Sequence, residues 1–148
     1  MNKNYIKMCI QADEIQELWE PKPGDLFYEE YSEKNKQFSK EHWLDADDHN
    51  GSFYHVSDSL DFINGSHSRY SKQLKEKCVY CPSQEDLQEI AFREIGLTTD
   101  LILGMLIDYY NEEYMGDGND LTSLWLCFVM EKCFKKRWDS EKEEWTFI

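Results

Sequence analysis

The sequence is short of proline, glycine and positive charge. Its 148 residues include 3 Pro and 7 Gly, and 16 Lys and Arg stand against 30 Asp and Glu, which gives a net charge of −14. A chain this acidic repels phosphate groups and anionic membranes, so we expect no direct binding to nucleic acid or to a membrane. With 41% hydrophobic and 15% aromatic residues, it is also too apolar for a disordered chain.

Long apolar runs are missing as well. The most apolar stretch, Leu101 to Leu106, is short and is soon followed by Asp108, so no span is expected. The first twenty residues mix polar and apolar side chains and show no secretion signal. We therefore expect a protein of the reducing cytoplasm with free thiols. The five cysteines are Cys9, Cys78, Cys81, Cys127 and Cys133.

Motifs of the common enzyme classes are absent, including the Walker loop, GxGxxG and GxSxG. Cys78-x-x-Cys81 is the one motif of catalytic type. A redox CxxC usually opens a helix, whereas here Pro82 follows and the pair ends an expected strand. Residues three apart in a strand point to opposite faces, and zinc would need two further ligands. We therefore interpret both cysteines as small buried hydrophobes and expect no enzyme, metal or cofactor.

The first half of the chain predicts a helix followed by strands. Residues 1–20 space their apolar side chains as one helical face, which Pro21, Pro23 and Gly24 end. Residues 25–82 contain three short β-type runs separated by polar, turn-rich stretches. This pattern predicts a small antiparallel sheet or a partial barrel. The runs cover residues 26–28, 52–56 and 78–81.

Residues 83–138 predict three helices. Ser83 and Asp86 resemble a capping box for the first, and Gly96 ends it. The second, Leu101 to about Met115, is apolar on most sides, so we expect it to be central. The third follows residues 116–120, and residues 138–148 predict a hairpin or extended tail with Trp138 facing Trp145. Strands before helices favour an α+β fold, in a single domain of residues 1–148.

The acidic residues cluster in two blocks. Residues 41–61 carry six acids and no Lys or Arg, and residues 85–120 carry ten acids with Arg93 alone. If the fold brings the blocks together, they form a negative face that suits a basic partner. Trp43 lies among polar neighbours and is therefore the expected exposed anchor. The candidate partner-binding residues are Trp43, Asp45, Asp47, Asp48, Asp108, Glu112, Glu113, Asp117 and Asp120.

Three stretches carry a family resemblance. They are EIQELWEPKPGD at residues 14–25, PSQEDLQE at residues 82–89, and LWLCFVMEK at residues 124–132 with the later Trp-Asp and Glu-Trp pairs. Together they resemble a family of small proteins encoded by phages and prophages of Gram-positive bacteria, which has no assigned activity. The resemblance covers both ends of the chain and leaves out residues 32–77. It places Cys81 where the family has leucine, and it implies no catalytic residues.

The setting that this resemblance implies is phage infection of a bacterial cell. In that setting, a small acidic chain without catalytic motifs predicts an anti-defence inhibitor of anti-CRISPR type. Such a protein binds a host effector stoichiometrically and can occupy its nucleic-acid channel by mimicking nucleic acid. The expected partner is a CRISPR effector or another nucleic-acid-binding defence protein.

Three other functions remain open at this point. One is a sponge that sequesters a nucleotide defence signal in a basic pocket. A second is a thiol or metal enzyme that uses Cys78 and Cys81, and a third is an accessory phage protein with another role. The basic residues available for a sponge are Arg69, Lys72, Lys75 and Lys77.

Overall fold

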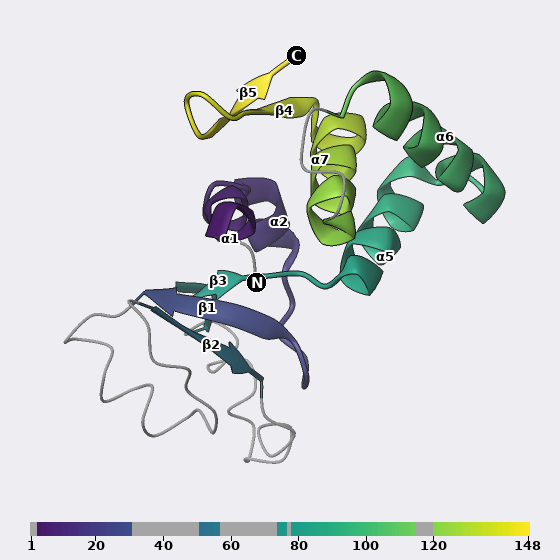
Figure 1. Ribbon diagram of the computed structural model, residues 1–148. Helices are drawn as coiled ribbons and strands as arrows, with labels where there is room; N and C mark the ends of the chain where they lie inside the picture. Colours follow the sequence, from purple (N-terminus) through teal and green to yellow (C-terminus); the bar gives the residue numbers. More distant parts are fainter. Residues whose placement is uncertain (1–2, 31–50, 57–73, 77, 115–119) are drawn as a thin grey trace. The chain divides into compact units, whose positions relative to one another are not determined.

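The computed structural model has a mixed α+β fold (Figure 1). The residues that it describes are 3–30, 51–56, 74–76, 78–114 and 120–148. They belong to two compact units, which we call the sheet unit (residues 13–81) and the helical unit (residues 1–12 and 82–148). The expectation of a single domain stays a prediction.

The described residues of the sheet unit form a short helix and three strands, and residues 74–76 are helical as well. The short helix is α2 (Asp13–Leu18), and the strands are β1 (Leu26–Glu30), β2 (Gly51–His55) and β3 (Val79–Tyr80). The strands follow the order β2-β1-β3, and both pairs are antiparallel, with Phe27 opposite Tyr54 on one side and opposite Tyr80 on the other. The three predicted strands are therefore confirmed. The alternative of a partial barrel is wrong for the described strands, because β2 and β3 form opposite edges of an open sheet.

An aromatic cluster fills the core of the sheet unit. Trp19 stacks on Tyr80 with 4.9 Å between ring centroids and 1° between planes, and it also contacts Phe27. Its Nε1 donates a hydrogen bond of 2.8 Å to Oδ2 of the buried Asp25, which also accepts from the backbone N–H of Lys22. Burying a carboxylate is costly unless donors satisfy it, so these bonds fix the entry into β1.

Helix α2 protects the outer edge of β3 with one side chain. Gln16 Oε1 accepts a hydrogen bond of 2.8 Å from the backbone N–H of Tyr80, and Gln16 Nε2 donates one of 3.0 Å to the Tyr80 carbonyl. The Gln16 amide thus pairs with β3 as a neighbouring strand would. At this position the edge of β3 cannot pair with a strand of another chain.

The CxxC cysteines lie at the end of this sheet. Cys78 and Cys81 are both buried, and the backbone N–H of Cys81 donates a hydrogen bond of 2.9 Å to the carbonyl of Leu26. The Sγ atom of Cys81 lies 3.7 Å from the carbonyl of Val79. The interpretation of these cysteines as buried small side chains is therefore confirmed.

In the helical unit, the described residues form four helices and a hairpin. They are α1 (Lys3–Ile10), α5 (Gln84–Ile95), α6 (Thr99–Glu112), α7 (Leu121–Phe134), β4 (Lys136–Asp139) and β5 (Glu144–Phe147). The single helix predicted for residues 1–20 is wrong: the chain leaves helical structure at Gln11 and Ala12, where the Ala12 N–H bonds back to the Cys9 carbonyl. The resulting α1 is held by the Tyr5 hydroxyl, which donates to the Pro82 carbonyl at 2.6 Å.

The predicted ends of α5 are confirmed. The Ser83 side chain accepts from the backbone N–H of Asp86, and the Asp86 carboxylate accepts from the backbone N–H of Ser83, which completes a capping box. Gly96 follows the helix with φ +70°, a left-handed conformation that favours glycine. The C-terminal hairpin is confirmed as well, with Trp138 opposite Trp145 and 5.2 Å between their ring centroids.

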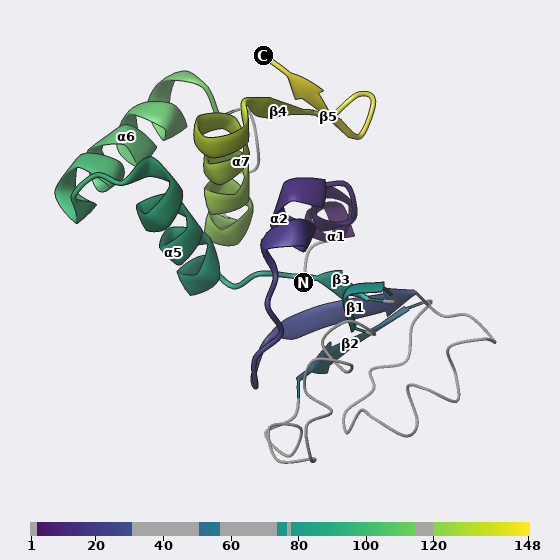
Figure 2. The same cartoon turned by 180° about the vertical axis from the view of Figure 1, so that it is seen from behind.

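Helix α7, and not α6, is the centre of the helical unit. Nine consecutive residues of α7, from Ser123 to Glu131, are buried. In α6 the buried residues are Ile102, Leu106 and Tyr109, so the prediction that α6 is central is wrong. Figures 1 and 2 show α6 at the outer edge of the group formed by α5, α6 and α7. One side of α6 is therefore open to solvent.

Candidate functional site: the acidic segment around α6

A segment without positive charge contains α6. Residues 94–131 include eight Asp and Glu and no Lys or Arg. We call these residues the acidic segment. Because a partner can meet only the acids that face solvent and are not already paired, the position of each carboxylate decides what the segment can bind.

The structure describes four of the nine candidate contact residues. Asp108, Glu112, Glu113 and Asp120 lie on or beside α6 and α7. The remaining five lie outside the described residues, so their predicted role stays a prediction. They are Trp43, Asp45, Asp47, Asp48 and Asp117.

Asp108 and Glu112 are exposed on α6. Asp100, in the first turn of the same helix, is exposed too, and a hydrogen bond with the Thr98 side chain lowers its pKa. We call Asp100, Asp108 and Glu112 the α6 acids. Asp100 was not among the predicted contact residues, although a lone acid in the first turn of a mainly apolar helix faces solvent more often than the core.

Asp120 has a structural role. It is the N-cap of α7, and its carboxylate accepts hydrogen bonds from the backbone N–H of Ser123 at 3.1 Å and from the Ser123 hydroxyl. A negative charge at this position also interacts favourably with the helix dipole. Asp120 therefore starts α7, and its charge is partly offset inside the protein.

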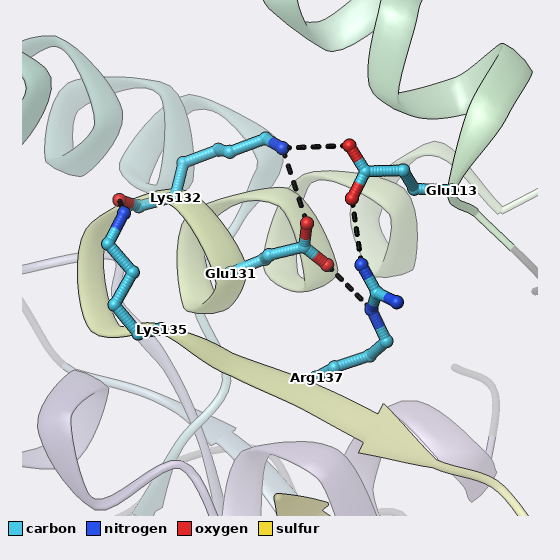
Figure 3. Close-up of polar contacts among 5 residues, drawn as sticks. All are labelled: Glu113, Glu131, Lys132, Lys135 and Arg137. Carbon is cyan, nitrogen blue, oxygen red and sulfur yellow. Dashed lines mark hydrogen bonds and ion pairs between the residues drawn. The ribbon is translucent and has the colours of Figure 1, made fainter. Parts of the chain in front are cut away.

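Glu113 belongs to a cluster of four charged residues at the end of α6 (Figure 3). Its two carboxylate oxygens lie 3.1 Å from Lys132 Nζ and 2.8 Å from Arg137 Nη2. Glu131 binds the same two cations, with Oε1 3.2 Å from Lys132 Nζ and Oε2 2.9 Å from Arg137 Nε. We call Glu113, Glu131, Lys132 and Arg137 the charge cluster. Two acids and two bases leave it neutral overall.

The charge cluster joins three elements of the helical unit. Glu113 follows α6, Glu131 and Lys132 end α7, and Arg137 lies on β4. The turn that brings Arg137 back is made by Lys135, which has φ 58° and whose Nζ donates to the carbonyl of Lys132 at 2.9 Å. The sequence pattern did not predict this cluster, because its members come from three separate elements. Its one local signal is Glu131, an acid that directly follows a long apolar run.

The cluster keeps Glu131 ionised although the side chain is buried. Burial alone would raise the pKa of Glu131, but hydrogen bonds from Arg137 and Lys132 outweigh it and hold that pKa well below its usual range. The bond to Glu131 likewise raises the pKa of Arg137. Lys132 also lies over the ring of Tyr109, 5.3 Å from its centroid. The cluster is therefore fixed structure and offers little charge to a partner.

Beside the α6 acids, the helix exposes apolar side chains. Leu103, Ile107 and Tyr110 are 43%, 60% and 46% exposed. Their spacing of four and three residues places them along one face of the helix. We call these three residues the α6 stripe. A central helix, as expected from the sequence, would bury such side chains, and nothing in their residue types distinguishes them from buried neighbours.

The other functions would use thiols or basic residues. Burial raises the pKa of Cys127 to about 12 and that of Cys133 to about 11, so both thiols are protonated at neutral pH. Of the basic residues considered for a sponge, Lys75 is described; it is exposed and donates to the carbonyl of Glu17 at 3.0 Å. Arg69, Lys72 and Lys77 lie outside the described residues.

Comparison with known proteins adds nothing to this geometry. Within the described part of the chain, every helix is too short or too polar to cross a membrane. The sequence and the fold match no protein-family model, no curated protein and no solved structure. The resemblance to the phage and prophage family therefore stays a prediction from the three stretches quoted above.

Proposed function

We propose that this chain is an acidic stoichiometric inhibitor, which binds a nucleic-acid-binding protein of the host and blocks its basic surface. The resemblance to phage and prophage proteins supplies the setting, in which a CRISPR effector is a partner of suitable chemistry. The protein then acts by occupancy and performs no reaction. The proposal assigns the contact to the α6 acids and, in the other acidic block, to Asp45, Asp47 and Asp48 with Trp43 as an anchor.

The observation that carries this proposal is the contrast between two kinds of acid in the acidic segment. Glu113 and Glu131 are neutralised by Lys132 and Arg137. The α6 acids are exposed, and no ion pair connects them to any residue that the structure describes. Their negative charge is thus available to a basic surface.

The α6 acids also share one side of their helix. At 100° per residue, positions 100, 108 and 112 span about 120° around the axis, and they extend over roughly 18 Å along it. A rigid row of carboxylates can replace several phosphates on a basic surface at once. Binding of this type is fast at low ionic strength and weakens as salt screens the charges.

A titration with matched charge variants tests the proposal. The partners are purified bacterial defence effectors, including a CRISPR effector with its guide RNA. The test variant carries Asp100→Asn, Asp108→Asn and Glu112→Gln, and the control carries Glu85→Gln, Glu141→Gln and Glu144→Gln, which remove three exposed acids elsewhere. Since both variants have the same net charge, a difference between them reports the α6 acids themselves.

We expect the test variant to bind roughly tenfold more weakly than the control, and saturating DNA to compete with the protein. A second variant, with Asp45→Asn, Asp47→Asn and Asp48→Asn, measures the other block in the same assay. An affinity that is unchanged by salt and by saturating DNA would contradict the proposal. Equal weakening in test and control variants would assign the effect to overall charge and remove α6 from the interface.

A further inference from the structure

At the C-terminal end of the α6 stripe, the side chain of Tyr110 is already packed on one side. Tyr110 stacks on Tyr114 with ring centroids 6.1 Å apart and 27° between planes, and Tyr114 also contacts Tyr109. Tyr109 is buried and lies edge-on against Phe128 of α7, with 5.7 Å between centroids. A ring that already packs on one side loses less freedom when a partner covers the other. Tyr110 is therefore suited to be an anchor.

The α6 stripe lies between the buried side of α6 and the α6 acids. The buried side of the helix carries Ile102, Leu106 and Tyr109, and it faces α5 and α7. The stripe borders this side, and the α6 acids continue the exposed surface beyond it. Single exposed apolar residues are ordinary, whereas three in a row on one helix face form a patch that a partner can bury.

The negative charge beside the α6 stripe favours a basic partner over a second copy of the chain. No Lys or Arg occurs in residues 94–131, so a second copy of the chain docked by the same face would bring the α6 acids close to like charges. Such contacts oppose self-association. An apolar surface bordered by Lys and Arg would bury the stripe and pair with the acids in one step.

We infer that the α6 stripe docks against an amphipathic helix of the partner whose apolar face is bordered by Lys and Arg. This inference rests on the proposed function and deepens it, because it names the element of the effector that is bound. Two helices of this kind pack with the side chains of one between those of the other. Basic helices also contact DNA in many nucleic-acid-binding proteins, so a helix that is bound to α6 can no longer bind nucleic acid.

The test uses two synthetic peptides with the intact 148-residue chain. The first peptide is a 20-residue helix with Leu at successive intervals of four and three and with Lys and Arg beside them. The second has the same composition, scrambled so that its Leu residues no longer share a face. Binding is measured by fluorescence anisotropy for the wild type, for Ile107→Asp, and for Ile10→Asp, which changes an isoleucine of α1 that is 47% exposed.

We expect the patterned peptide to bind at least tenfold more tightly than the scrambled one. Ile107→Asp should remove that preference, and Ile10→Asp should leave it within twofold. Both variants change exposed residues, and circular dichroism checks that they fold.

Three results would overturn the inference. Equal affinity for both peptides would show that charge alone acts, and no affinity for either would show that the stripe binds no helix of this type. Sedimentation that shows a dimer, lost in Ile107→Asp, would make a second copy the occupant. Because the peptides replace the effector, each of these results leaves the effector titration to test the proposed function separately.

Discussion

Helices α6 and α7 have the same length and are both largely apolar, but their surroundings differ. Each has 14 residues. Among the described elements, α7 packs against α5, α6 and β4, whereas α6 packs mainly against α5 and α7. The apolar content of a helix sets how much surface it is able to bury, and the elements around it determine how much it does bury. In this chain the less covered helix retains the exposed apolar and acidic groups.

The largest expected difference between the two helices concerns leucine truncation. Leu126 of α7 is fully buried, and Leu103 of α6 is exposed. Leu126→Ala should lower the free energy of unfolding by about 2–5 kcal/mol, because it leaves a cavity, and Leu103→Ala by less than about 0.5 kcal/mol. Urea unfolding of both variants measures this difference. Equal losses would mean that α6 is covered in solution.

The charge cluster, which joins the two helices, should give the next largest effect. Glu131→Gln leaves Lys132 and Arg137 without their buried partner, and we expect a loss of about 2 kcal/mol, less than for a fully buried pair because Arg137 is half exposed. Glu113→Gln should cost less than about 1 kcal/mol, since this carboxylate is more exposed. The same urea experiment measures both, and a larger effect of Glu113→Gln would contradict the role assigned to Glu131.

The cluster also predicts how stability depends on pH. The pKa of Glu131 is lower in the folded protein than its ordinary value of 4.5, so its contribution is fully present above that value and is lost as pH falls toward about 2. The wild type should therefore lose about 1–2 kcal/mol more than Glu131→Gln over this interval. Denaturation curves at a series of pH values would show it. Parallel curves for the two proteins would rule out Glu131 as the source.

The smallest difference is expected at the two N-caps. Asp120 caps α7 through Ser123, whereas Thr98 makes no capping hydrogen bond with its side chain to α6. Asp120→Ala should lower the free energy of unfolding by about 1 kcal/mol, and Thr98→Ala by only a few tenths. Thermal unfolding followed by circular dichroism is sensitive enough for this comparison. A greater effect at Thr98 would show that the start of α6 is held more firmly than its contacts indicate.

The sequence predicted the parts of the fold that depend on neighbouring residues. The capping box at Ser83 and the glycine at position 96 are local signals, and both ends of α5 were placed correctly. The hairpin follows from the spacing of Trp138 and Trp145. Such features are encoded within a few residues, so they depend little on how the rest of the chain packs.

Features that depend on distant residues were missed. Glu113 meets Arg137 only because Lys135 turns the chain back, and this pairing spans 24 residues. The exposure of Ile107 depends on which helices cover α6, and its residue type gives no indication of it. Of the candidate contact residues, Asp108 and Glu112 are exposed as binding requires, whereas Glu113 and Asp120 already have partners inside the protein.

The side chain that pairs with the edge of β3 has a consequence for the order of folding. Gln16 and Tyr80 are 64 residues apart in the chain, so their two hydrogen bonds form only after a long loop has closed. Contacts of such high sequence separation slow folding. Until that loop closes, the backbone groups of Tyr80 that Gln16 later satisfies remain exposed. We therefore expect this chain to be most prone to aggregation before the Gln16 amide reaches β3.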